Sequence, residues 1–222
     1  MERMARDSGV FTNSAIHRVP FGVDTVSYRP GDRFAVRERL GIPREAFVLL
    51  ARASRSEFKG YPELDAMLGR AAWRNAVLLT VDGKNLFDHR KDRYLVMDQG
   101  WVLDDERMAD LYRASDVFVM TSRAESFGMM AVEAMACGTP VVAFRNTALA
   151  ELLDDGRTGV LVEDGDSAAL LDGINRIKED ARYRAELIDA ALLRVKAEYD
   201  FEAHFRAIRE AYASAIARRA NA

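Results

Sequence analysis

The sequence has few features of a secreted or membrane-spanning protein. Its 222 residues include a single cysteine, which excludes an internal disulfide framework and favours a reducing compartment. No apolar run approaches the roughly 18 residues that a membrane span needs. The N-terminus carries charges without the apolar core of a secretory signal, and Asn-x-Ser/Thr acceptor sites are absent. We therefore expect a cytoplasmic protein, at most peripheral to the inner face of a membrane.

An excess of charge of one sign is also lacking. The chain has 32 Lys and Arg residues against 35 Asp and Glu residues, a formal net charge of −3. A protein dedicated to nucleic acid is usually basic, so we expect no nucleic-acid partner. Hydrophobic residues make up 49% of the chain, enough for a packed core, which excludes the disordered classes.

Nucleophiles and metal ligands are scarce. Cys137 lies in an apolar stretch without the motif of a cysteine enzyme, so we expect a small buried hydrophobe. The three histidines, His17, His89 and His204, fit no catalytic motif and are expected to be ordinary surface or capping residues. Residues 1–46 contain several turn signals and are predicted to be irregular.

From residue 47 onward, short apolar runs alternate with helical patterns. Most runs are unbroken, which is typical of strands buried on both faces of a parallel sheet. The predicted strands are Phe47–Leu50, Ala76–Val81, Tyr94–Met97, Asp116–Met120, Thr139–Phe144 and Gly159–Val162. The predicted helices are Pro62–Ala72, Asp104–Ala114, Phe127–Ala136, Ala148–Asp154, Ser167–Asp180, Ala181–Glu198 and Phe201–Arg219. This alternation predicts an α/β domain whose ligands bind at the carboxyl ends of the strands.

Residues 116–144, DVFVMTSRAESFGMMAVEAMACGTPVVAF, are the most informative stretch. A strand runs into a loop, and Ser126 is a suitable N-cap for the helix that follows. Gly128 falls near the second helical position, where it would leave the backbone N–H groups open to an anion.

Glu133 is the only charge on that predicted helix. A carboxylate among apolar residues needs a partner, which could be a basic residue of the core or the two adjacent hydroxyls of a ribose. Glu125 precedes the helix at the same edge. It could face a ligand or favour the helix dipole from solvent. The residue types alone leave both alternatives open.

The block from Glu125 to Glu133, followed by Ala134-Met-Ala-Cys-Gly-Thr-Pro-Val-Val, resembles the E-x7-E signature of retaining glycosyltransferases of family 4. Four further blocks resemble that family in the same order, and the resemblance covers residues 17–215. They are Val19–Asp24, Ala51–Gly60, Asp105–Asp116 and Asp155–Gly159.

Members of this family have the GT-B architecture, in which two Rossmann-like domains face each other across a cleft. All the matching blocks belong to the nucleotide-sugar donor domain. The resemblance thus implies a single Rossmann-like domain over residues 20–198, with a parallel sheet flanked by helices. It also implies that residues 1–19 are a remnant of the inter-domain region. Residues 199–222 would form a helix that packs on the acceptor-binding domain.

The resemblance also implies roles for single residues. Arg52 and Lys59 would bind the phosphates, with Arg55 as a substitute for Arg52, and Glu125 would face the sugar and stabilise its developing positive charge. The donor-binding residues would be Phe127, Gly128, Met129, Met130, Glu133, Gly83, Trp101, Val102 and Leu103. No cofactor and no metal are expected, since the family is metal-independent and no Asp-x-Asp element lies near these loops.

The leading interpretation is the donor-binding half of a retaining glycosyltransferase acting in glycan or polysaccharide biosynthesis, incomplete as this chain alone. The alternative is a stand-alone module that binds a nucleotide sugar without catalysis. A nucleotide-sugar epimerase half is disfavoured by the E-x7-E block. The acceptor, a glycan or lipid-linked sugar, would be held by an N-terminal domain or a partner chain. An apolar stripe on the last helix leaves room for a homodimer.

Overall fold

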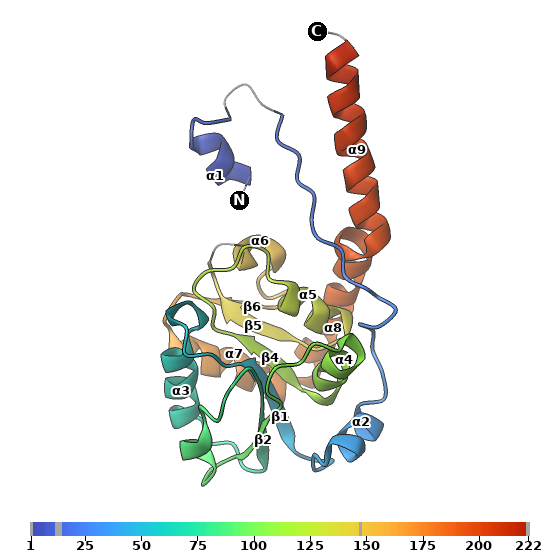
Figure 1. Cartoon of the computed structure of the whole chain (residues 1–222). Coiled ribbons are helices and arrows are strands. Elements are labelled where there is room, and N and C mark those ends of the chain that lie inside the picture. Colours follow the sequence, from blue (N-terminus) through green and yellow to red (C-terminus); the bar gives the residue numbers. More distant parts are fainter. Residues whose placement is uncertain (1, 12–14, 147, 221–222) are drawn as a thin grey trace.

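The protein is built around a six-stranded parallel sheet. The computed structural model describes residues 2–11, 15–146 and 148–220. The strands are β1 (Phe47–Arg52), β2 (Ala76–Val81), β3 (Leu95–Asp98), β4 (Val117–Met120), β5 (Val141–Phe144) and β6 (Val160–Val162), in the order β3-β2-β1-β4-β5-β6 (Figure 1). The order reverses direction between β1 and β4, which places a topological switch point at their carboxyl ends. The predicted Rossmann-like α/β class is confirmed.

Helices cover both faces of the sheet. The longer ones are α2 (Arg33–Leu40), α3 (Tyr61–Arg70), α4 (Asp105–Ala114), α5 (Met129–Ala136), α7 (Ser167–Glu179), α8 (Ala181–Arg194) and α9 (Phe201–Ala220). Short elements are α1 (Glu2–Asp7), α6 (Leu149–Leu152), the 3-10 turns η1 (Glu57–Lys59) and η2 (Asp88–Arg90), and the π-helical turn η3 (Val195–Tyr199). The α3 and α7 helices share one apolar core with the sheet, and α4 and α5 share the other.

The prediction that residues 1–46 are irregular is wrong, because α1 and α2 lie within them. One of the turn signals there, at Gly41, is a helix cap. The Asp32 side chain accepts hydrogen bonds from the first turn of α2, and Gly41 ends the helix at φ 70°. The buried Arg37 anchors α2 by donating to the carbonyls of Ala114 and Ala46 and by pairing with Asp116 at 2.8 Å. Ala114 and Asp116 are 77 and 79 positions away in the sequence, so no local pattern indicated them.

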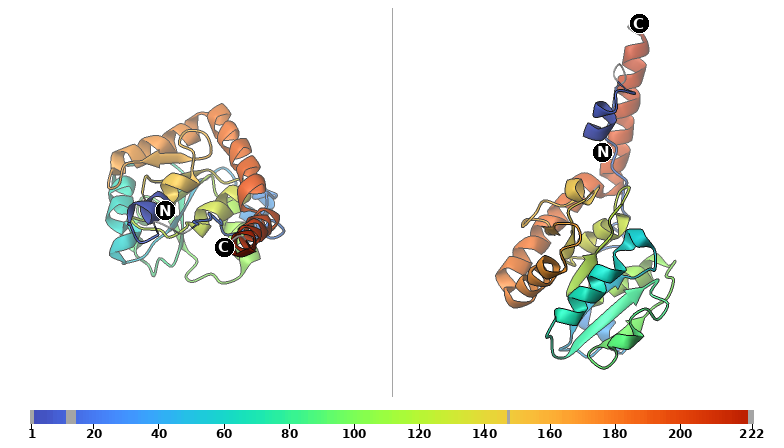
Figure 2. Two further views of the ribbon diagram at one scale, coloured as in Figure 1. Left: turned by 90° about the horizontal axis from the view of Figure 1, so that it is seen from above. Right: turned by 90° about the vertical axis from the view of Figure 1, so that its left-hand side faces the viewer.

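The C-terminal helix α9 projects from the body of the molecule, and residues 15–22 run along its base (Figure 2). Hydrogen bonds at its C-terminal end help to hold this segment. The Val23 N–H donates to the Tyr199 carbonyl at 2.7 Å, and His204 Nδ1 lies 2.6 Å from the Pro20 carbonyl oxygen. The boundaries at residues 19/20 and 198/199 stay a prediction, and residues 1, 12–14, 221 and 222 of the outer segments lie outside the described residues. Within the described ranges, no helix is both long and apolar enough to cross a membrane.

Candidate functional site

An ion pair joins two of the predicted catalytic residues. Lys59 Nζ lies 2.5 Å from Glu125 Oε1, and both side chains are mostly buried, at 17% and 15% exposure. Lys59 ends the η1 turn after β1, and Glu125 lies in the loop after β4. Because β1 and β4 are neighbours in the sheet, their carboxyl-end loops meet. The structure therefore brings together the predicted phosphate cation and the predicted sugar-facing carboxylate.

Backbone contacts between the two loops explain this pairing. The Thr121 hydroxyl donates to the Lys59 carbonyl at 2.9 Å, and the Arg123 N–H donates to the Phe58 carbonyl at 2.8 Å. Gly60, the residue after Lys59, is where the two loops approach each other closely. It has φ +61°, and a Cβ there would lie 2.0 Å from the Thr121 carbonyl oxygen. Only glycine permits this approach, so Gly60 fixes the position from which Lys59 reaches Glu125.

Most of the other predicted residues surround one cavity of about 270 Å³. Its predicted members are Arg52, Trp101, Val102, Leu103, Met130 and Glu133. Gly100, which begins the loop that the family resemblance places at the base, also lines it. Its walls further contain residues that sequence reasoning did not assign to the site: Tyr28, Val81, Asp82, Asp104, Asp105 and Met108. The cavity adjoins the carboxyl ends of β1, β2 and β3, where an α/β sheet binds its ligands.

Arg52 is held at the mouth of this cavity by two neighbours. It ends β1, its Nη2 lies 3.6 Å from Asp82 Oδ2, and its guanidinium carbon lies 5.7 Å from the centroid of the Trp101 ring. The Trp101 side chain is 64% exposed, so its ring is available for stacking with a flat ligand. A guanidinium next to an exposed indole suits a ligand that carries both a phosphate and a base.

Asp98 connects the two loops that form the outer wall. Its Oδ1 accepts the Gly100 N–H and its Oδ2 accepts the Asn85 N–H, both at 3.0 Å. Gly83 packs tightly here, since a Cβ would lie 2.8 Å from the Thr80 hydroxyl oxygen. Gly83 itself does not line the cavity, so its predicted contact with the donor stays a prediction.

Glu133 finds a partner that the sequence analysis did not consider. The Tyr112 hydroxyl donates to Glu133 Oε2 at 2.9 Å. Burial raises the pKa of the Glu133 carboxyl, the Tyr112 hydrogen bond opposes this, and the Asp105 carboxylate raises the pKa further. The core partner of the carboxylate is thus a neutral hydroxyl, rather than the basic residue that the sequence analysis considered. A buried tyrosine hydroxyl usually has a partner, and this was the signal available for Tyr112.

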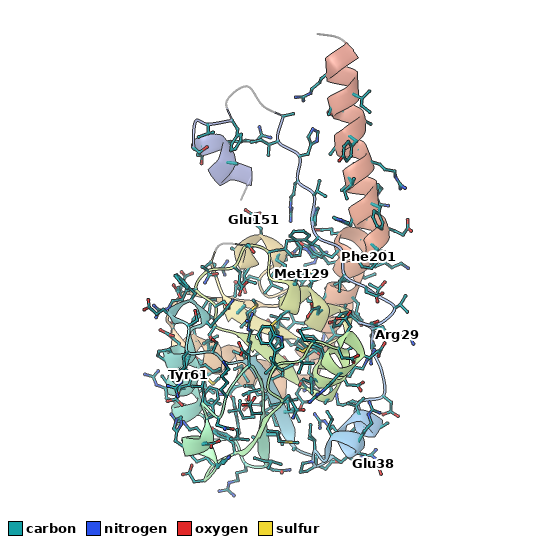
Figure 3. All side chains as sticks on the ribbon, in the orientation of Figure 1. Arg29, Glu38, Tyr61, Met129, Glu151 and Phe201 are labelled. Carbon is teal, nitrogen blue, oxygen red and sulfur yellow. The ribbon has the colours of Figure 1, made fainter. Side chains whose placement is uncertain are left out.

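The predicted helix start is wrong by two residues. Gly128, rather than Ser126, is the N-cap of α5. The helix begins at Met129, which is labelled in Figure 3. Gly128 has φ +93°, and a Cβ would lie 2.8 Å from Leu149 Cδ2. A side chain at residue 128 would thus be strained and crowded, and the first N–H groups of α5 remain without helical acceptors.

Seven predicted residues do not line this cavity. Phe127 and Arg55 line other hollows, and the rest are Lys59, Gly83, Glu125, Gly128 and Met129. The Phe127 ring packs edge-on against Phe21 and Tyr199, with centroids 5.2 and 6.0 Å away. It lines a second, more apolar cavity of about 360 Å³ beside the N-terminal segment. Arg55, the substitute for Arg52, lines a separate hollow with Arg123.

Cys137 is buried as predicted, and burial raises the pKa of its thiol to about 12. Among the described residues, no group of three or more His, Cys, Asp and Glu side chains could hold a metal ion.

Comparison with known proteins agrees with this arrangement. The family described as "Glycosyl transferases group 1" matches residues 38–194. The D-inositol 3-phosphate glycosyltransferase of Acidothermus cellulolyticus is 33% identical over 195 residues, which cover 80% of this chain and 43% of that protein.

Two solved structures are similar to this chain over more than four fifths of its length. A sucrose-phosphate synthase from Thermosynechococcus elongatus superposes with a TM-score of 0.83 at 26% identity, over 97% of this chain and 56% of that one. Anabaena HepE in complex with UDP-glucose superposes with a TM-score of 0.74 at 26% identity, over 86% of this chain and 56% of that one. The chain thus spans about half the length of these proteins, and it belongs to the group 1 glycosyl transferase family.

Proposed function

We propose that this chain is the donor half of a retaining glycosyltransferase. The observation that carries this proposal is the Lys59–Glu125 ion pair, which lies at the same carboxyl-end edge of the sheet as the cavity that contains Glu133. Both glutamates of the E-x7-E block face the same edge of the sheet, one paired with a cation and the other lining a cavity. We further propose a uridine diphosphate sugar as donor, since the similar HepE structure contains UDP-glucose.

Each side chain would then have a distinct task. As the glycosidic bond to the diphosphate breaks, negative charge grows on the leaving phosphate and positive charge on the sugar. Arg52 and Lys59 would stabilise the phosphate with fixed charge, together with the N–H groups that open α5. The Glu125 carboxylate would face the sugar and offset its positive charge. Glu133 would accept hydrogen bonds from the ribose hydroxyls.

The acceptor would be held by a second Rossmann-like domain, either elsewhere in a longer chain or on a partner. The apolar cavity lined by Phe21, Phe127 and Leu152 supports this, because it opens beside the N-terminal segment and next to α5. Relatives are named for D-inositol 3-phosphate, so a phosphorylated polyol is one acceptor class to test alongside glycans and lipid-linked sugars. A cytoplasmic location, a peripheral membrane contact and a homodimer remain predictions.

Binding measurements with the purified chain test the donor assignment. Calorimetry with UDP, GDP and ADP should give binding of at least one diphosphate, unchanged by EDTA if no metal is required. Lys59→Ala should weaken that binding about tenfold, the effect of one lost charged hydrogen-bond partner. Lys91→Ala, which removes an exposed lysine paired with Asp88, is the matched control and should bind normally. Failure of every diphosphate to bind would contradict the proposal.

A turnover assay separates an enzyme from a binding module. The chain is mixed with a nucleotide sugar and candidate acceptors, with and without the first domain of a relative, and release of the nucleoside diphosphate is followed. We expect release only when the acceptor domain is present, since the acceptor must be held within about 3–3.5 Å of the reacting carbon. Donor binding without turnover under every condition would favour the binding module.

A further inference from the structure

The buried Tyr112 hydroxyl donates a hydrogen bond to the Glu133 carboxylate from inside the protein. We propose that Tyr112 is a positioning residue, which holds the Glu133 carboxylate so that its other oxygen meets the donor ribose. This inference rests on the proposed function, because that function gives Glu133 a ribose to bind. Tyr112 itself touches no ligand, since its side chain is fully buried and does not line the cavity.

Tyr112 is fixed from several sides. Its ring meets Phe118 edge-on at 5.5 Å and Tyr28 at 6.3 Å, and its carbonyl accepts the Thr139 hydroxyl at 2.8 Å. A tyrosine with this packing has little rotational freedom, so its hydroxyl is a fixed donor at the base of the carboxylate. The hydrogen bond to Glu133 therefore sets the direction of the carboxylate as well as stabilising it.

Glu133 depends on this one hydrogen bond. Across the described part of the chain, Tyr112 is the sole side chain that hydrogen-bonds the Glu133 carboxylate. A carboxylate has about four acceptor positions, so one bond leaves most of its capacity unused. Glu133 lines the cavity from α5 and is only partly buried, so the unused capacity is accessible to a ligand hydroxyl.

A purely structural role for the pair is less well supported. Tyr94, another buried tyrosine, satisfies its hydroxyl with the Leu68 carbonyl at 2.8 Å, and no charge is buried in doing so. Tyr112 instead meets a carboxylate, whose burial costs free energy. The neighbouring Tyr28 is not a substitute, because its hydroxyl donates to Asp105 at 3.0 Å.

The hydrogen bond from Tyr112 also affects the pKa of the Glu133 carboxyl, as do the charged groups around it. Four titratable groups act on Glu133 or are affected by it: Tyr112 and Asp105 on α4, Tyr28 before α2, and Cys137 at the C-cap of α5. The wall of the same cavity also contains Arg52, Asp82 and Asp104. Burial and Asp105 both favour the neutral carboxyl, whereas the Tyr112 hydroxyl favours the ionised one. The Tyr112 hydrogen bond thus favours the ionised, acceptor-only form, which can accept from two ribose hydroxyls.

The test uses UDP and 2′,3′-dideoxy-UDP, which differ only in the ribose hydroxyls. The wild-type chain should bind UDP about tenfold or more tightly than the dideoxy compound, as expected for hydrogen bonds to a charged group. In Tyr112→Phe this preference should fall to about twofold or less, with little change for dideoxy-UDP. Tyr94→Phe, which loses a buried hydroxyl hydrogen bond away from the cavity, should keep the wild-type preference.

The outcomes separate this inference from the proposed function. If the wild-type chain prefers UDP and Tyr112→Phe keeps that preference, Tyr112 is only structural and the inference is wrong. If the wild-type chain binds both compounds equally well, donor binding stands and the ribose contact fails. If neither UDP, GDP nor ADP binds, both proposals fall.

A measurement on the wild-type chain covers the case in which Tyr112→Phe does not fold. With [ζ-13C]tyrosine labelling, the Tyr112 resonance should shift when UDP binds and stay in place when dideoxy-UDP binds. The reason is that the ribose hydroxyls draw charge from the carboxylate that Tyr112 supports. Equal shifts, or none, with the two ligands would overturn the inference.

Discussion

The Lys59 ammonium and the Glu125 carboxylate lie 2.5 Å apart, although 66 positions separate them in the sequence. Each of the two charges neutralises the other in the ligand-free site. A diphosphate that binds Lys59 must compete with Glu125, and a sugar that binds Glu125 must compete with Lys59. The two halves of a nucleotide sugar can replace both partners at once, which favours the complete donor over either half.

This competition predicts an unusual effect of Glu125→Gln. The variant should bind UDP about fivefold more tightly, because an ion pair of about 1 kcal/mol no longer occupies Lys59. Turnover with an acceptor domain should fall at least about a hundredfold, since the charge facing the sugar is lost. Calorimetry and a diphosphate-release assay measure the two effects.

Glu57→Gln is the matched control, because Glu57 is exposed on the η1 turn that also contains Lys59. It should leave UDP affinity within about twofold of the wild-type value, as expected for a surface substitution. Weaker UDP binding by Glu125→Gln would show that Glu125 supports the diphosphate site rather than competing for it.

Arg52→Ala and Lys59→Ala should distinguish the phosphates from the nucleoside. We expect each variant to weaken UDP binding by about 1.5–3 kcal/mol, the usual value of a hydrogen bond to a charged group. Binding of uridine should change much less. Paired calorimetric titrations with the two ligands measure the difference. Equal losses for UDP and uridine would place these side chains away from the phosphates.

The sequence indicated the sheet and the edge where the site lies. Each of the six strands overlaps a predicted apolar run. The signal is strongest for β1, β2, β4 and β5, which are buried almost throughout and therefore almost entirely apolar. The roles expected of Glu125 and Glu133 came from the resemblance of the whole block, Glu125 to Val142, to the family, because two glutamates at this spacing are not specific by themselves. Helix α2 was missed because Arg37 and Asp116, which hold it in place, are 79 positions apart.

The contacts inside the site depended on how separate elements pack. No local pattern shows that Lys59 reaches Glu125, because the approach of Gly60 to Thr121 decides it. Similarly, the Tyr112–Glu133 hydrogen bond needs the relative position of α4 and α5. Sequence periodicity identifies the buried face of each helix, but it does not pair side chains across two helices.

Gly60→Ala should disrupt the site through the backbone. At φ +61°, its Cβ would lie 2.0 Å from the Thr121 carbonyl oxygen, so the η1 turn must move. We expect a loss of about 2–4 kcal/mol in the free energy of unfolding, from backbone strain together with a clash. UDP binding should weaken as well, because Lys59 moves with the turn. Urea unfolding and calorimetry measure both effects.

Gly41→Ala is the control that separates the two effects of Gly60→Ala, the steric clash with Thr121 and the backbone strain at positive φ. Gly41 has φ +70° at the end of α2, and a Cβ there would meet nothing within 4 Å. This variant should lose only about 1–2 kcal/mol, the cost of a left-handed conformation for alanine, and should bind UDP normally. Similar losses for the two variants would mean that the contact with Thr121 is unimportant.

The raised pKa of Glu133 predicts how UDP binding depends on pH. Ribose hydroxyls donate to the ionised carboxylate, so binding should weaken as pH falls through the pKa of Glu133. Because burial raises that pKa, the loss should begin above the roughly 4.3 of an ordinary glutamate. Titrations of UDP across the acidic range measure this midpoint.

The same shift predicts the pH dependence of folding without ligand. A carboxyl with a raised pKa in the folded state contributes stability that is fully present below its unfolded pKa and is lost as pH rises through its folded pKa. Glu133→Gln has no such titration, so its free energy of unfolding should rise relative to that of the wild-type chain over this interval. The difference should be constant above and below it. A difference that does not change with pH would mean that Glu133 titrates normally, and the ribose-binding midpoint should then lie near 4.3 as well.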